Sequence, residues 1–253
     1  MRADSTKRFS NRVDNYVKYR PTYPPQVMEY LANKCHLNEQ SVIADIGSGT
    51  GIFTKLLLDK DYSVYSVEPN QSMRKRAEHD LKQYPKFTSI EGSAEDTTLA
   101  PYSIDLIVCA QAFHWFCNEE TKKEFKRILK PDNCVALIWN NRQTDADAFA
   151  IAYELLLQEK TPDYSEVNHQ NLAETDFINF YKNGQYTLVK YPNVQIFDFD
   201  GLKGRAFSSS YVPAEDTEEG QQFLAALQEI FDQYQVKGKV KFTYQTEVYL
   251  GEL

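Results

Sequence analysis

Apolar and polar positions follow two different periods along the first 140 residues. Short continuous apolar runs are typical of buried parallel strands, and apolar residues three or four positions apart are typical of amphipathic helices. Strand-type runs cover residues 41–46, 62–68, 87–92, 103–111 and 134–140, and helix-type runs cover 24–35, 52–60, 71–83 and 121–130. The alternation predicts an α/β fold, a doubly wound three-layer sandwich whose ligand lies at the carboxyl ends of the strands.

The pattern changes after residue 140. A helix is expected at 145–160, a strand at 194–200, a long helix at 217–234 and an alternating strand at 240–250. The polar stretch within 145–191 predicts a substrate-side cap inserted over the sheet. No repeat or low-complexity linker divides the chain, which favours a single domain over residues 1–253.

The segment VDNYVKYRPTYPP, residues 13–25, is rich in tyrosine and proline. We expect it to be neither a regular helix nor a strand, because proline removes a backbone donor and restricts its neighbour. Residues 1–36 are therefore predicted to form an N-terminal lid followed by the first helix.

Composition places the chain among ordinary globular proteins. Of its 253 residues, 42% are hydrophobic and 25% are charged. No run approaches the roughly 20 apolar residues of a membrane span, so we expect a cytoplasmic protein without a membrane partner. The four cysteines are scattered without a CxxC pair, which favours reduced thiols over disulfides and indicates no metal site.

The formal net charge of −8 opposes attraction to a phosphate backbone and argues against a nucleic-acid partner. The only candidate basic face is TKKEFKRILK, residues 121–130. Its apolar residues recur at helical spacing, so it is interpreted as the solvated face of an amphipathic helix.

The segment VIADIGSGTG, residues 42–51, carries the strongest chemical signal. An apolar strand ends in Asp45, and three glycines follow at alternate positions, where the backbone can turn tightly and approach a ligand. A dinucleotide fingerprint starting at Gly47 would need glycine where the chain has Ile52. A phosphate loop starting at Gly49 would need glycine where the chain has Thr54. Both phosphate-binding interpretations fail on spacing.

Charge supports the same conclusion. Asp45 would repel a pyrophosphate but would attract a cationic ligand. S-adenosylmethionine has an ammonium and a sulfonium at one end and an adenosine at the other. Glu68, which ends the next strand, is placed to accept hydrogen bonds from both hydroxyls of an unphosphorylated ribose.

Several segments together resemble class I S-adenosylmethionine-dependent methyltransferases of the small-molecule, type 11-like kind: VIADIGSGTGIFT, VEPNQSM, GSAED, SIDLIVCAQAFHWF and LKPDNCVALIWNNR. The match covers roughly residues 40–142. RPTYPP, AFHWF, GRAFSSSYVP and VKFTYQTEVYLG add some likeness to trans-aconitate methyltransferase relatives. The resemblance implies a seven-stranded sheet of order 3-2-1-4-5-7-6 with the last strand antiparallel.

The resemblance also implies a cofactor site. Asp45 and the loop 47–51 would receive the methionine part of the cofactor, Glu68 the ribose, and Ala94 and Glu95 the adenine. The family often has Asp where this chain has Ser93, which puts that side-chain contact in doubt. The full set of expected cofactor residues is Tyr16, Arg20, Asp45, Gly47, Ser48, Gly49, Gly51, Glu68, Pro69, Ser93, Ala94, Glu95 and Gln111. Arg20 would give the methionine carboxylate a cationic partner, or would only brace the first helix.

Methyl transfer requires an acceptor placed close to the methyl group and shielded from water. The segment AFHWF makes His114 a candidate general base and Trp115 a candidate wall of the pocket. A carboxylate acceptor would instead need cationic anchors, for which Arg142 and Arg205 are candidates. The sequence leaves O-, N- and C-methylation open.

Two other functions stay open at this point. A regulatory protein that binds the cofactor without turnover would carry the same loop. A protein or RNA methyltransferase would need an open acceptor groove, which the acidic charge and the predicted cap both argue against.

Overall fold

The computed structural model describes residues 13–161, 164 and 172–253. The strands are β1 (Val42–Ile46), β2 (Ser63–Val67), β3 (Phe87–Ile90), β4 (Ile104–Ala110), β5 (Leu129–Arg142), β6 (Thr187–Phe197) and β7 (Val240–Glu252). The α-helices are α1 (Val13–Tyr19), α2 (Pro25–Lys34), α3 (Ile52–Leu58), α4 (Gln71–Leu81), α5 (Glu119–Ile128), α6 (Ala148–Lys160), α7 (Glu174–Phe180), α8 (Phe199–Phe207) and α9 (Glu218–Tyr234). Two short 3₁₀ turns are η1 (Phe113–Trp115) and η3 (Lys182–Gly184).

The seven strands form one sheet in the order β3-β2-β1-β4-β5-β7-β6. β7 runs antiparallel to both β5 and β6, and the other neighbouring strands are parallel. This confirms the predicted fold class and strand order. Because β1 lies between β2 and β4, the loops that follow these three strands meet at one edge of the sheet.

Hydrophobic side chains cover both faces of the sheet. Ile43 packs in one cluster with residues of α2 and α3, and its neighbour Ala44 packs in another with Phe125 of α5. Consecutive residues of a strand point to opposite faces, so the apolar run in β1 supplies both cores at once. The four cysteines are free thiols, and Cys109 is fully buried.

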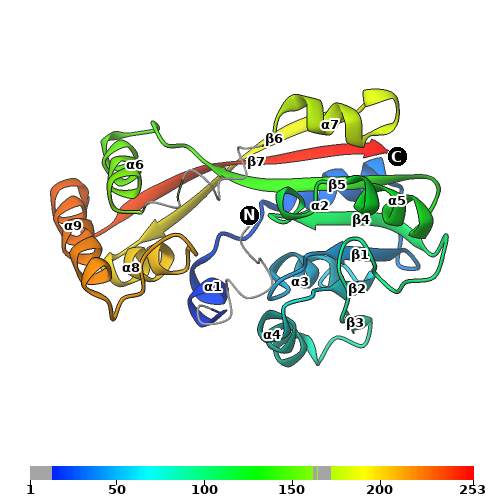
Figure 1. The fold of residues 1–253 in the computed structure, drawn as a ribbon, viewed down its shortest axis with the longest axis horizontal. Helices are drawn as coiled ribbons and strands as arrows, with labels where there is room; N and C mark the ends of the chain where they lie inside the picture. Colours follow the sequence, from blue (N-terminus) through cyan, green and yellow to red (C-terminus); the bar gives the residue numbers. More distant parts are fainter. Residues whose placement is uncertain (1–12, 162–163, 165–171) are drawn as a thin grey trace.

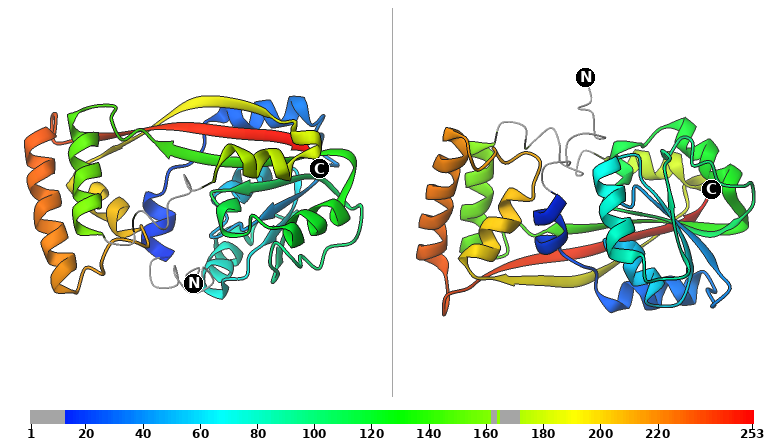
Figure 2. Two further views of the ribbon diagram at one scale, coloured as in Figure 1. Left: turned by 45° about the horizontal axis from the view of Figure 1, so that its top comes forward. Right: turned by 90° about the horizontal axis from the view of Figure 1, so that it is seen from below.

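Three helices form a separate lobe at one end of the molecule. In Figures 1 and 2, α6, α8 and α9 stand apart from β1–β4, and β5, β6 and β7 extend into the lobe as a long ribbon. The lobe has its own apolar cluster, which includes Tyr153, Leu202, Phe223 and Phe242. β7 contributes to both the central sheet and this cluster, so the lobe is held to the sheet by continuous strands.

The expectation that residues 13–25 contain no regular structure is wrong for their first part. Val13–Tyr19 forms α1, and the helix ends before Pro21 because a proline disfavours helical backbone in the preceding residue. A side-chain carbon on Gly204 would come within 2.0 Å of the Tyr19 ring. α1 therefore packs against α8 at Gly204, the position where α8 presents no side chain. Local sequence cannot reveal this contact between distant segments.

The predicted limits of the cap also need correction. β6 begins at Thr187, inside the predicted insertion 145–191, and α8 and α9 belong to the lobe although they follow that strand. β6 contains Pro192, and it is an edge strand, where a residue without a backbone N–H is tolerated. The division into one domain with an N-terminal lid stays a prediction.

Within the described part of the chain, no helix has both the length and the apolar character needed to cross a membrane.

Candidate active site

A cavity of about 340 Å³ lies between the carboxyl edge of the sheet and the helical lobe. From the sheet side it is lined by residues of the loops after β1, β2, β3 and β4, and from the lobe side by Arg142, Arg205, Tyr211 and Tyr244. All the predicted site residues line it except Gly51 and Tyr16. The side chain of Tyr16 lies outside the described residues, so its predicted contact stays a prediction.

The glycine loop approaches neighbouring backbone closely. Gly47 and Gly49 have positive φ angles of 69° and 58°, and the N–H of Gly47 donates to the Val67 carbonyl at 2.9 Å. A Cβ on Gly47 would lie 2.7 Å from that of Ala112, so no larger residue fits. Gly51 instead caps α3 with φ 82° and packs against Leu81. Its observed role is to turn the chain into the helix.

Asp45 is fully buried at the end of β1. Its Oδ2 accepts a hydrogen bond from Thr54 Oγ1 at 2.6 Å, while none of the described residues donates to its buried Oδ1. Burial is the main cause that raises the pKa of Asp45 to about 7, and the bond from Thr54 only partly opposes it. A cation placed beside this carboxylate would favour its ionised form.

Glu68 follows β2 and is held by backbone donors. Its Oε2 accepts from the N–H of Gly49 and its Oε1 from the N–H of Asn70, each at 2.8 Å. Arg74 Nη1 donates to the Glu68 carbonyl at 2.9 Å. Burial raises the pKa of Glu68, although both backbone hydrogen bonds act to lower it. The Gly49 bond links the loop after β1 to the loop after β2.

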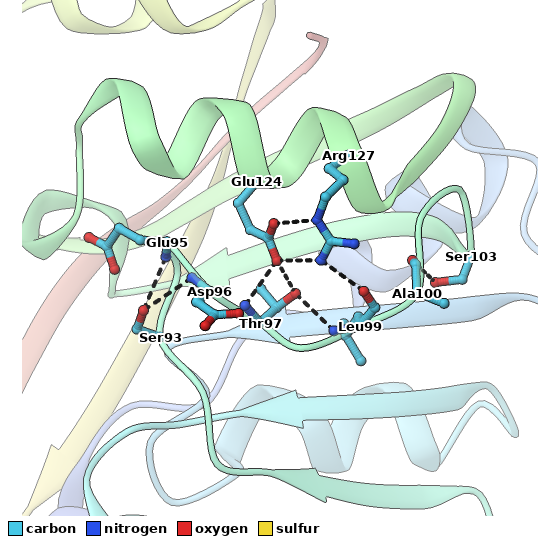
Figure 3. Close-up of polar contacts among 9 residues, drawn as sticks. All are labelled: Ser93, Glu95, Asp96, Thr97, Leu99, Ala100, Ser103, Glu124 and Arg127. Carbon is cyan, nitrogen blue, oxygen red and sulfur yellow. Dashed lines mark hydrogen bonds and ion pairs between the residues drawn. The ribbon is translucent and has the colours of Figure 1, made fainter.

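The loop after β3 is shown in Figure 3. Ser93 Oγ accepts hydrogen bonds from the N–H groups of Glu95 and Asp96 at 3.3 and 3.2 Å. The hydroxyl at this position therefore shapes the loop itself, as an Asp would. Glu95 Oε1 accepts from Asn118 Nδ2 at 2.9 Å.

Glu124 in α5 fixes the next part of this loop (Figure 3). Its Oε1 accepts from the N–H and the hydroxyl of Thr97 at 2.9 and 2.5 Å. Arg127 donates to both oxygens of Glu124 and to the Leu99 carbonyl. Burial acts to raise the pKa of Glu124, but the hydrogen bonds from Arg127 and Thr97 outweigh it and lower the pKa to about 2. The sequence pattern of residues 121–130, interpreted only as a solvated face, did not predict this support.

Two arginines face the cavity from the lobe side. Arg142 Nη2 donates to Glu154 and to the Tyr164 hydroxyl, whereas none of the described residues accepts from its buried Nη1. Arg205 is 7% exposed. Its Nε donates to the Tyr244 hydroxyl and its Nη1 to Ser209 Oγ, both at 3.2 Å.

The charges of these arginines are only partly balanced. Both guanidinium carbons lie 5.9 Å from the centre of the Phe242 ring, so the two cations flank one side chain. Glu154 pairs with Arg142, but within the described chain no carboxylate forms an ion pair with Arg205. Among the residues that the structure describes, the lobe end of the cavity therefore carries an excess positive charge, which suits an anionic ligand.

His114 and Trp115 lie in η1, directly after β4. Gln111, at the turn out of the strand, has a positive φ of 62°. Both His114 and Trp115 line the cavity, and Trp139 Nε1 donates a hydrogen bond to His114 Nδ1 at 3.5 Å. Whether His114 acts as a base stays a prediction.

Arg20 follows α1 and contacts the lobe. Its Nη2 donates to the Ser208 carbonyl, just after α8, at 3.1 Å. It also lines the cavity, which agrees with both of the roles considered for it, a cofactor contact and a brace. Thr54 and Tyr244 were missed from the sequence. The inward-facing positions of β7 could have pointed to Tyr244, but nothing in the local sequence pairs Thr54 with Asp45.

A family profile described as a methyltransferase domain matches residues 44–137. An uncharacterised methyltransferase of a Geobacillus species is 30% identical over 155 residues, which are 58% of this chain and 71% of that protein. The chain belongs to the class I S-adenosylmethionine-dependent methyltransferase family. This confirms the predicted family and its cofactor, S-adenosylmethionine. An uncharacterised methyltransferase of Schizosaccharomyces pombe is 37% identical over 135 residues. The chain spans about half the length of that relative, 53%.

Solved structures of other methyltransferases share the fold of this family member. A candidate type II methyltransferase from Anaeromyxobacter dehalogenans superposes with a TM-score of 0.67 at 20% identity, covering 92% of this chain and 98% of that one. A methyltransferase from Geobacter sulfurreducens, solved with S-adenosylhomocysteine, has a TM-score of 0.55 at 15% identity and covers 98% of both chains. At these identities the likeness shows the fold alone.

We predict that Glu124→Gln destabilises this methyltransferase at neutral pH by ~1–3 kcal/mol, because it weakens charge-assisted hydrogen bonds to a buried loop. The stabilisation by Glu124 is complete above the pKa of an unfolded glutamate, about 4.5, and is lost as the pH falls toward its folded pKa of about 2. Urea unfolding of the wild type and the variant between pH 3 and 8 should therefore show a difference in unfolding free energy that becomes smaller below about pH 4.5. A difference that does not depend on pH would contradict the role of ionised Glu124 in holding the loop after β3.

Proposed function

We propose that this methyltransferase transfers a methyl group from S-adenosylmethionine to a small-molecule acceptor that carries a carboxylate. The observation that carries the proposal is the charge distribution of one cavity. Its sheet side presents the buried carboxyl groups of Asp45 and Glu68, and its lobe side presents Arg205, which forms no ion pair with a carboxylate of the described residues. A cationic cofactor and an anionic acceptor would each meet groups of opposite charge.

The sheet side suits the cofactor. The unpartnered Oδ1 of Asp45 would accept from the cationic methionine end, and Glu68 would turn toward the ribose hydroxyls. Ala94 and Glu95 would meet the adenine, and Gly47–Gly49 would let the backbone approach. When bound, the cofactor supplies a methyl group that its sulfonium activates for displacement.

The lobe side suits an acceptor that is already ionised. Arg142 Nη1 has no acceptor among the described residues, so a carboxylate held beside Arg205 could accept from it. Burial is the main cause that raises the pKa values of Tyr153 and Tyr164, so these hydroxyls stay neutral donors or acceptors near pH 7. A carboxylate needs no proton removed before methylation, and its methyl ester would have lost the charge that Arg205 attracts.

The size of the cavity favours a small acceptor. The cavity between sheet and lobe measures about 340 Å³, whereas a protein or RNA acceptor would need a long open groove. A regulatory protein without turnover is the remaining alternative, and formation of any methylated product would exclude it. The cytoplasmic location stays a prediction.

We expect S-adenosylhomocysteine to bind and to raise the melting temperature by mass action. Glu68→Gln should weaken binding by ~1.5–3 kcal/mol, because it removes a charged acceptor of the ribose hydrogen bonds. Glu91→Gln is a matched control, since Glu91 is exposed and contacts Arg74 outside the cavity. Isothermal titration calorimetry measures the S-adenosylhomocysteine affinity of both variants. Equal affinities for the wild type and the Glu68 variant would contradict the ribose role, and a response only to NAD or ATP would contradict the cofactor site.

The acceptor class can be tested with S-adenosylmethionine labelled in its methyl group. We expect transfer to members of a panel of small carboxylic acids, giving label that mild base releases as methanol, as only a methyl ester does. Arg205→Gln should lower kcat/KM for the acid ~10-fold or more, by removing a charged hydrogen bond, with little change in S-adenosylhomocysteine affinity. Label that resists base, or an unchanged kcat/KM, would contradict a carboxylate held by Arg205.

A further inference from the structure

The side chain of Trp139 contacts one ring nitrogen of His114, a residue that lines the cavity. Trp139 lies in β5 and is 2% exposed. Its indole ring is packed edge-on against Phe177 and Tyr249, with ring centres 6.0 and 5.8 Å away. From this fixed position its Nε1 donates to His114 Nδ1 at 3.5 Å.

An indole N–H can only donate, so Nδ1 of His114 must accept and cannot carry a hydrogen while this bond is made. The neutral imidazole then carries its hydrogen on Nε2. His114 lines the cavity, and in this tautomer its second nitrogen is a hydrogen-bond donor. A general base needs a free lone pair on the nitrogen that meets the acceptor, and this tautomer does not provide one.

We propose that His114 is a hydrogen-bond donor that orients an ionised oxygen of the acceptor, and that Trp139 is the positioning residue that fixes its tautomer. This rests on the proposed function, since it concerns the same acceptor. His114 Nε2–H and the guanidinium groups of Arg142 and Arg205 then form a set of donors on one cavity. Such a set selects an acceptor that arrives ionised, and it favours O-methylation of a carboxylate over acceptors that must first lose a proton.

The side chain of His114 is held on its other flanks as well. The preceding residue, Phe113, is fully buried and packs 4.5 Å from the Phe180 ring centre. The ring of His114 lies 4.9 Å from that of Trp115. The packing of Phe113 thus holds η1 in place. The role that we assign to Trp139 is to set the tautomer of His114.

Nitrogen-15 NMR of the histidine rings tests the tautomer without any acceptor. Spectra of the protein with S-adenosylhomocysteine at pH 8, where a neutral imidazole predominates, would be assigned by comparison with His114→Gln. We expect His114 to carry its hydrogen on Nε2. In Trp139→Phe the population should shift toward the Nδ1–H form, while Tyr249→Phe, which alters a neighbour of Trp139 without touching His114, should leave it unchanged. A hydrogen on Nδ1 in the wild type would overturn the inference and leave the methyltransferase assignment intact.

Kinetics with the best carboxylic acid of the labelled panel test the donor role. His114→Gln keeps an N–H near the position of Nε2 and should retain kcat/KM within ~3-fold, whereas His114→Ala should lose ~10-fold, the range for a hydrogen bond to a charged group. If His114 were a base, log kcat/KM of the wild type would rise with pH through the histidine range and the Gln variant would be inactive. We expect the pH profiles of wild type and His114→Gln to have the same shape. An ionisation present only in the wild type would overturn the proposal.

Discussion

The buried carboxyl group of Asp45 constrains the whole of this methyltransferase. It lies at the end of the central strand β1 with one oxygen bonded to Thr54 and the other without a described donor. Burial raises its pKa, so the free protein holds a carboxylate whose ionised form is disfavoured. A cation at that place relieves this cost. The loop after β1 must then leave room for the ligand, which its glycines do.

The lobe also holds a buried charged group, but its charge is positive. Arg205 is as buried as Glu68 and remains charged at any physiological pH. Neutral hydroxyls of Tyr244 and Ser209 solvate it, yet they do not cancel its charge. The two ends of the cavity thus carry groups of opposite charge, and the proposed transfer from a sulfonium to an anion rests on this contrast.

Hydrogen bonds connect the N-terminal segment to the lobe. Tyr244, which contacts Arg205, donates to Gln195, and Gln195 donates to the Tyr19 carbonyl at the end of α1. Arg20 continues the connection to the Ser208 carbonyl after α8. A ligand that contacts Arg20 would therefore also act on the helix that carries Arg205.

The sequence was sufficient for the strands of the central sheet, which are encoded locally, and the resemblance supplied their order. The cofactor contacts of the predicted site residues stay a prediction. Apolar runs set the strands, and the order of strand, glycine loop, strand and acid set Asp45 and Glu68. The rest depends on contacts between distant segments. α1 packs against α8 where Gly204 has no side chain. Glu124 in α5 accepts hydrogen bonds from the loop after β3, and Trp139 lies 25 positions along the chain from His114, to which it donates. Local periodicity carries no information about such pairs, and it also concealed that β6 begins at Thr187.

A crystal structure with S-adenosylhomocysteine bound tests the central claim most directly. The account predicts ribose hydroxyls on the Glu68 carboxylate, the ammonium beside Asp45, and the sulfur facing a space bounded by His114, Arg142 and Arg205. A ligand bound with its adenine against Arg205 would contradict the proposal that the two ends of the cavity bind groups of opposite charge. Side chains that fill the space between the sulfur and the arginines would contradict it as well.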